Sequence, residues 1–323
     1  MLLLYPRQLS RVLAGCRRFS AAPNLVELGT LSSPKVEDRY PAGQVFLHRV
    51  FAYRGVVVCS FDCKVYGKQK ANENTSKFEV VPYYQVLIHK GDWDHMRMPV
   101  DLTVYLSENG GREGKSIGII NGMDCVPHND ILPLEYRVQK NGTAPIDHDL
   151  FDRLFKFMDP NRPELGYVNT HNVPSQRSWM APQATHVETT NNVRVTATTF
   201  YLGQNSINGQ IKHCWRYVVR LENLDGSDLI LRDRQIKVFS LNNLTQVNGG
   251  GVVGEYPRLS TADPAYQFSS TVQLLQKKGG HLWGKFKLEK EEDGTVFEVN
   301  MPTLLLESNS SQNSHGNNEN VVQ

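Results

Sequence analysis

The chain of 323 residues lacks several features that would assign it to a common class of protein. No run of about 20 apolar residues occurs, so the sequence offers no helix suited to span a membrane. Of its five cysteines, Cys59 and Cys63 form a spaced pair without a second pair at zinc-ribbon spacing. No HExxH, GxSxG or paired-carboxylate motif is present. We therefore expect free, mostly buried thiols, no metal, no cofactor and no enzyme.

Acidic residues are missing from the first 26 positions, which carry four arginines. On a helical wheel Arg7, Arg11 and Arg18 share one side, and apolar residues face the opposite way. An amphipathic, arginine-bearing and acid-free N-terminus is typical of a mitochondrial transit peptide. A disordered basic tail is the alternative, whereas the apolar block at 2–4 is too short for a secretory signal.

The sequence around Arg17, Phe19 and Ser20 resembles a matrix-peptidase cleavage context, with an arginine three residues before the cut. We predict a presequence over 1–19 and a linker over 20–37. Removing the four arginines changes the balance from 35 basic and 33 acidic side chains, or +2, to 31 and 33, or −2. Because nonspecific nucleic-acid binding requires a dense excess of Lys and Arg, direct DNA binding is a minor hypothesis.

A glycine-rich motif at 249–257 spells GxGxxG, but its surroundings do not suit a dinucleotide site. Such a fingerprint needs a strand before it and a helix after it, because the pyrophosphate lies on the helix N-terminus. Here Pro257 removes a backbone donor three residues after the last glycine, and 266–274 alternates as a strand does. The motif is therefore predicted to be a loop inside an all-β domain.

Two interpretations of this loop stay open. Successive amides from Gly249 to Gly254 could form an anion-binding nest for phosphate, which would make the chain a nucleotide- or DNA-binding module. Alternatively, the glycines permit positive φ in a tight loop whose two valines pack inward. The candidate ligand or partner residues of the loop are Gly249, Gly251, Val252, Val253, Gly254, Glu255 and Pro257.

Strand-like stretches surround the loop on both sides. In 215–221, Trp215 and Val219 share one face, and Arg216 and Arg220 lie on the other. About seven short strands over 186–307 predict a β-sandwich. The clearest of them are 193–200, 215–221, 229–239, 266–274 and 281–288.

The motifs of this region resemble the ApaG domain. They are Trp215-Arg-Tyr, Leu221-Glu-Asn, Gly251-Val-Val-Gly-Glu with Pro257, Phe268-Ser-Ser and Gly280-His-Leu-Trp-Gly, in that order. The resemblance covers about 186–307 and implies an immunoglobulin- or fibronectin-III-like β-sandwich. The biochemical activity of that family is poorly defined, so the resemblance implies a fold more firmly than a reaction.

A second region, 38–146, resembles the YccV-like domain, a small β-barrel. The motifs are Gly43-Gln-Val-Phe-Leu-His, Tyr53-Arg-Gly-Val-Val, Tyr83-Tyr-Gln-Val-Leu and His128-Asn-Asp-Ile-Leu. From them we single out Phe46, His48, Tyr53, Arg54 and Gly55. Bacterial members of that family are associated with hemimethylated DNA and with protease regulation. The polar stretch at 67–77 is predicted to be an exposed loop.

Residues 147–185 join the two domains. Phe151, Leu154 and Phe155 recur at helical spacing, and Pro160 would end the helix, so 147–159 is predicted to be an amphipathic helix with an irregular linker after it. Asn, Ser, Gln and Gly dominate 308–323, which is predicted to be a disordered tail.

The histidines offer weak catalytic candidates. His128 with Asp130 could be a base and its orienter, but two polar turn residues are the favoured interpretation. His281 is expected to cap a turn, and His213, beside Cys214, to mark the entrance of a strand.

The presequence, YccV-like domain, helical connector and ApaG domain together resemble the polymerase delta-interacting protein 2 family. The resemblance spans about 27–307, and nothing here resembles the F-box of other ApaG proteins. It implies a non-enzymatic adaptor of the mitochondrial matrix, and in some settings of the nucleus. The implied partners are a DNA polymerase delta subunit, the sliding clamp, a primase-polymerase and ClpX of the ClpXP protease. The near-neutral charge of the chain indicates that any contact with DNA is indirect. We expect a monomer.

An exposed sheet edge could bind partner peptides by strand addition, but the sequence does not reveal which edge is open.

Overall fold

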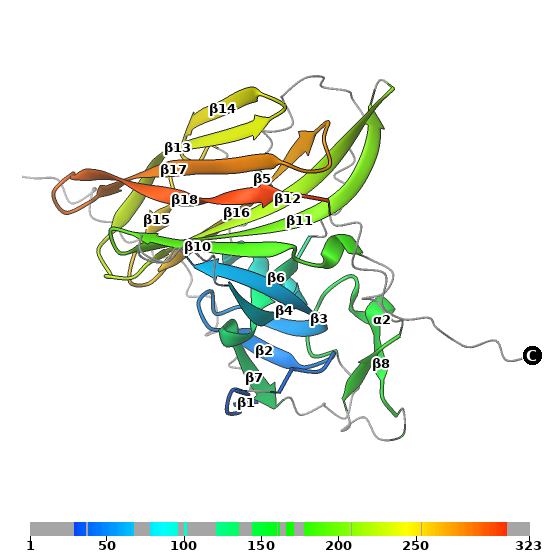
Figure 1. Cartoon of the computed structure of the whole chain (residues 1–323). Helices are drawn as coiled ribbons and strands as arrows, with labels where there is room; N and C mark the ends of the chain where they lie inside the picture. The colour runs from blue at the N-terminus through cyan, green and yellow to red at the C-terminus, as the bar shows by residue number, and fades with distance from the viewer. Residues whose placement is uncertain are drawn as a thin grey trace, which may run out of the picture.

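The computed structural model describes residues 29–36, 38–67, 78–95, 100–101, 121–135, 144–159, 161, 166–170, 178–207, 209–252 and 254–308. Strands dominate these residues and form two β domains, which confirms the predicted fold class (Figure 1). The predicted presequence with Arg17, Phe19 and Ser20, most of the loop at 67–77 and most of the tail lie outside the described residues. No helix within the described ranges is long and apolar enough to cross a membrane.

The N-terminal domain is a curved sheet around one core. Its strands follow the hydrogen-bonded order β7-β2-β3-β4-β6, and the end strands β6 and β7 are joined by η4, so the sheet bends back on itself. Tyr53, Tyr84 and Ile131 fill the core and have no exposed surface. The elements of this part are β1 (Thr30–Leu31), β2 (Val45–His48), β3 (Arg54–Gly67), β4 (Phe78–Ile88), η2 (Lys90–His95), β5 (Val100–Asp101), β6 (Met123–Pro127), η4 (His128–Asp130) and β7 (Ile131–Glu135).

The connector differs from its prediction. Helix α2 (Phe151–Leu154) is a single turn, and the chain continues directly into β8 (Phe155–Phe157), which pairs with β9 (Tyr167–Asn169) before η6 (Ser178–Met180). The predicted helix over 147–159 is therefore wrong outside this turn. The apolar residues of this segment cover the outer face of the N-terminal sheet, where they pack against Val58 and its neighbours. A single turn followed by a strand is enough to direct these side chains onto the sheet.

The C-terminal domain is a β-sandwich. One sheet has the order β10-β11-β12-β16, and the other has the order β14-β13-β17-β18 with β15 beside β13. The alternation predicted for 215–221 holds, since Trp215, Tyr217, Val219 and Leu221 are fully buried between the sheets. The strands are β10 (Ala184–Thr190), β11 (Val193–Ile207), β12 (Gln210–Asn223), β13 (Leu229–Ser240), β14 (Asn243–Gly250), β15 (Arg258–Leu259), β16 (Ala265–Leu274), β17 (Gly280–Lys290) and β18 (Val296–Leu306).

The two domains share a sheet. Strand β3 of the N-terminal domain pairs in parallel with β10, from Lys64 opposite Ala184 to Gly67 opposite Val187. The first sheet of the sandwich is therefore continuous with the N-terminal sheet, while β4 and β6 lie beneath it (Figure 1). As a result, this sheet is packed on both faces.

Candidate functional site

The glycine loop closes the open end of the β13–β14 hairpin. Gly249 and Gly250 belong to β14, and Gly251, at φ +58°, turns the chain away from it. A Cβ at Gly251 would collide with the carbonyl oxygen of Glu255, so glycine is required there. Val252 is fully buried in the sandwich core, as the structural interpretation of the loop predicts. Its neighbour Val253 lies outside the described residues.

Several amides of this loop are already hydrogen-bonded within the protein. The N–H of Gly251 donates to the carbonyl of Arg232 at 2.7 Å, and Val252 and Glu255 exchange bonds of 2.8 and 3.0 Å. Arg234 also donates from Nη1 to the carbonyl of Gly251 at 2.5 Å. The chain then enters β15 rather than a helix. This geometry is that of a tight turn between strands, and it confirms that the motif is a loop in an all-β domain.

The YccV-like motif residues shape the β2–β3 hairpin from inside. Phe46 and Tyr53 have no exposed surface, and Gly55 lies opposite Phe46, where a Cβ would come within 2.7 Å of the phenyl ring. Arg54 donates from Nε and Nη2 to the carboxylate of Asp92 at 2.9 and 2.6 Å. These residues support the fold of the domain.

His48 connects this motif to the boundary between the domains. Its Nδ1 accepts hydrogen bonds from the amides of Val50 and Phe51 at 3.1 Å each, and its Nε2 lies 3.9 Å from Oδ2 of Asp130. Because Nδ1 is an acceptor, the ring proton is on Nε2 and faces Asp130. Burial lowers the pKa of His48 to about 3, so the ring is neutral near pH 7.

A chain of ion pairs crosses the boundary. Asp130, in η4, accepts a hydrogen bond from Nη1 of Arg220, in β12, at 2.6 Å. Nη2 of Arg220 lies 3.3 Å from Glu222, which also accepts two hydrogen bonds from Arg194 at 2.8 and 3.0 Å. Burial by itself would lower the pKa of Arg220, but Asp130 and Glu222 raise it above the ordinary value. The positive charge is therefore held permanently between two carboxylates.

Asp124 makes a second connection. Its Oδ2 accepts from the hydroxyl of Tyr53, and its Oδ1 accepts from Nε2 of Gln267 in β16, both at 3.0 Å. Burial, with Asp124 adding to it, raises the pKa of Tyr53 well above the ordinary value, so the phenol remains a donor. We call Asp124, Asp130, Arg220, Glu222 and Gln267 the seam.

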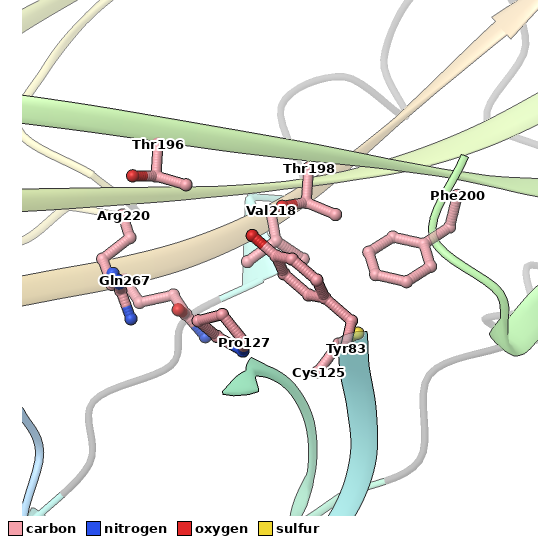
Figure 2. Close-up of a pocket in the computed structure, with 9 residues that line it drawn as sticks. All are labelled: Tyr83, Cys125, Pro127, Thr196, Thr198, Phe200, Val218, Arg220 and Gln267. Carbon is pink, nitrogen blue, oxygen red and sulfur yellow. The ribbon is translucent and has the colours of Figure 1, made fainter. Parts of the chain in front are cut away.

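A small cavity lies at the seam. Its volume is about 30 Å³, enough for a water molecule but too small for a substrate. Figure 2 shows Tyr83, Cys125 and Pro127 reaching it from the N-terminal domain, with Arg220 and Gln267 opposite them. The remaining lining residues are Thr196, Thr198, Phe200 and Val218. The charge of Arg220 is fixed, His48 is neutral and the cavity has room only for water. These features suit the attachment of one domain to the other rather than proton transfer.

The other histidines also have structural partners. His128 shares a hydrogen bond of 2.9 Å with the hydroxyl of Tyr84 through Nδ1 and one of 2.7 Å with the carbonyl of Lys35 through Nε2, so both ring nitrogens have partners other than Asp130. His213 bonds through Nδ1 to the hydroxyl of Tyr201 at 2.7 Å. His281 lies 3.2 Å from the carbonyl of Gly279, which fits the predicted role at a turn.

The sequence pattern does not reveal the seam. The pattern predicts a polar turn at Asp130 and a polar strand face at Arg216 and Arg220, and it indicates no partner for either arginine. One sequence signal points to the seam: two arginines lie on one face of a strand whose other face is apolar. Since the chain has a second domain, that domain can cover the face with the arginines and supply carboxylate partners. The guanidinium of Arg216 lies over the ring of Phe200, 4.4 Å from its centroid.

Comparison with known proteins relates the chain to two domain families. The ApaG domain family matches residues 203–290, and the family described as hemimethylated DNA-binding protein YccV like matches residues 39–162. Protein ApaG of Paramagnetospirillum magneticum is 33% identical over 122 residues, which cover 38% of this chain and 92% of that protein.

Two further relatives match over both domains. Polymerase delta-interacting protein 2 of Mus musculus is 36% identical over 306 residues, which cover 89% of this chain and 81% of the mouse protein. The Homo sapiens protein of that name is 35% identical with the same coverage. The extent of this similarity shows that the chain belongs to the polymerase delta-interacting protein 2 family.

Proposed function

We propose that the chain is a non-enzymatic adaptor that binds DNA replication proteins, above all a subunit of DNA polymerase delta. The observation that carries the proposal is the match over both domains to relatives whose name states such an interaction. The seam supports it, because buried ion pairs and hydrogen bonds join two β domains into one body. A rigid body of this kind can present two surfaces at a fixed separation.

The proposal extends to place and further partners. The acid-free, arginine-bearing N-terminus supports import into the mitochondrial matrix, followed by cleavage before Ser20, and the nucleus is a second site of action. The further partners are the sliding clamp, a primase-polymerase and ClpX of the ClpXP protease. The near-neutral charge of the processed chain supports indirect contact with DNA.

A crosslink-stabilised pull-down from isolated mitochondria tests the adaptor function. The bait is the chain beginning at Ser20, and the control is an unrelated matrix protein with the same tag. Specific recovery of ClpX or of replication proteins is expected. If neither class is recovered and a metabolite co-purifies instead, the proposal is wrong.

Import is tested separately. A fluorescent fusion of the whole chain should enter mitochondria, and replacement of Arg7, Arg11 and Arg18 by glutamine should prevent entry, because the presequence depends on its basic face. Entry unchanged by these substitutions would contradict the transit peptide.

A further inference from the structure

We infer that the outer edge of β14 is a docking site for an extended segment of a partner protein, which adds a strand to the second sheet of the sandwich. Figure 1 shows β14 as the last strand of that sheet, on the side away from the N-terminal domain. The inference deepens the proposed function by naming a surface that the adaptor uses, and it rests on that function for the identity of the partner.

The edge of β14 is open in the described part of the chain. There β14 pairs with β13 alone, along its whole length from Asn243 to Gly250. Other sheet ends in this part are shorter, since β1, β5 and β15 have two residues each and β6, which pairs only with β4, has five. Strand β18 is held to the first sheet by a hydrogen bond of 2.9 Å from Asn300 to Glu188. Strand β14 therefore offers a long edge that no other described strand covers.

The hairpin geometry fixes which backbone groups face outward. Strands β13 and β14 are joined by Leu241 and Asn242, at φ +49° and +63°, which is a two-residue type I′ turn. In such a hairpin the residues that flank the turn exchange both hydrogen bonds. The alternation then directs the N–H and C=O groups of Leu244, Gln246 and Asn248 to the open edge.

The edge lacks the features that normally prevent strand addition. Natural edges are protected by charged side chains, proline or bulges. The sequence of β14 contains no proline and no charge, and its register with β13 is continuous. An uncharged, regular edge of eight residues, about 26 Å long, invites pairing with another chain.

Apolar side chains at the hairpin end provide specificity. The sheet register places Leu244, Phe239, His281 and Leu305 in one row across the outer face. Leu244 is 53% exposed, Phe239 38% and Leu305 43%, so an apolar side chain of the added strand would extend this row.

Farther along β14 the neighbours are polar. Nε2 of Gln246 donates to Oδ1 of Asn248 at 2.9 Å. Beyond them, Tyr256 covers Gly250, since a Cβ built on Gly250 would lie 2.8 Å from the phenol oxygen. Tyr256 therefore limits the accessible part of the β14 edge. The occupant is therefore an extended segment with an apolar residue beside Leu244 and small polar residues, such as serine or threonine, beside Gln246 and Asn248.

A second copy of the chain fits this edge less well. Two-fold antiparallel pairings that use most of the edge set Leu244 opposite Asn248 or Gly250 of the other copy and not opposite an apolar residue. Pairing Leu244 with itself would leave an overlap of only about three residues. The edge therefore favours a different protein as its occupant.

The test uses a phage-displayed library of random 12-residue peptides, selected on the chain beginning at Ser20. Selected peptides are measured by fluorescence anisotropy against the wild-type chain, Gln246→Pro and the matched control Gln246→Thr. Proline removes an outward N–H and crowds the edge without removing a bond to β13, whereas threonine keeps the amide. We expect Gln246→Pro to bind at least about tenfold more weakly than the other two proteins.

A second measurement does not depend on the proline variant folding well. Amide hydrogen exchange of the wild-type chain, followed by NMR, should show that a bound peptide protects Leu244, Gln246 and Asn248. Recovery of no peptide, equal binding to Gln246→Pro or protection elsewhere would each overturn the inference. So would a wild-type dimer that becomes monomeric in Gln246→Pro, because the occupant would then be a second copy.

The two proposals can fail separately. If Gln246→Pro still recovers the replication proteins that wild type recovers, the adaptor function stands and docking at the β14 edge is overturned. If selected peptides require the edge but wild type recovers no replication protein, the docking site stands and the proposed function is wrong.

Discussion

Replacing Arg220 by methionine should show how much the seam contributes to stability. The side chains of Arg220 and Asp130 are 12% and 11% exposed, so methionine would keep most of the packing and remove the charge. Glu222 would retain Arg194, but Asp130 would remain buried without a cation.

The expected loss follows from that orphaned carboxylate. Breaking a buried ion pair by removing one partner costs about 3–5 kcal/mol. With roughly 2–4 °C lost per kcal/mol for a body of this size, Tm should fall by about 10 °C. The double variant Arg220→Met with Asp130→Leu should recover most of the loss, because an apolar pair of similar size is often as stable as the buried ion pair.

Differential scanning fluorimetry and tryptophan fluorescence measure these changes. The matched control is Arg258→Met, whose ion pair with Glu291 is exposed and whose loss should shift Tm by at most about 4 °C. Trp93 reports on the N-terminal domain, Trp215 and Trp283 report on the sandwich, and Trp179 reports on the connector, so a weakened seam should resolve unfolding into two transitions. A fall of less than about 2 °C in Arg220→Met, or a double variant as unstable as the single one, would refute the reasoning.

Three further predictions follow from the same structure. Gly251→Ala should lower the free energy of unfolding by roughly 1–3 kcal/mol, because the added Cβ collides with the backbone of Glu255. The control Gly254→Ala should lower it less, because a Cβ there meets nothing within 4 Å, and equal losses in urea unfolding would contradict this explanation. The folded state holds His48 neutral, with a pKa of about 3 against about 6.5 in the unfolded state. The stability that depends on neutral His48 should therefore be complete above about pH 6.5 and fall as the pH drops toward 3. A His48→Gln variant with an equally steep pH dependence would exclude His48 as the cause. Burial raises the pKa of the Cys59 thiol to about 12, so iodoacetamide at pH 8 should not modify this thiol until the protein unfolds. Mass spectrometry measures the modification, and rapid labelling of the native protein would disprove the burial of Cys59.

The strands with strict alternation could be predicted because a period of two residues reports burial on one face directly. The sequence pattern does not predict strand β14, because Asn and Gly have low strand propensity. Its pairing with β13 depends on the tight turn at Leu241 and Asn242. The connector was mispredicted because one turn followed by a strand gives Phe151, Leu154 and Phe155 the same apolar spacing as a longer helix.

Local pattern and motif therefore determined the two β domains, their families and the loop character of the glycine motif. The tertiary structure alone decided which distant parts of the chain lie together. It places Arg220 against Asp130, 90 residues away, and pairs β3 with β10. It also leaves β14 at an open sheet edge. Periodicity identifies a buried or polar face, but it carries no information on which distant face will cover it. That choice depends on the packing of the whole chain, because each such contact is stable only when both domains are folded around it.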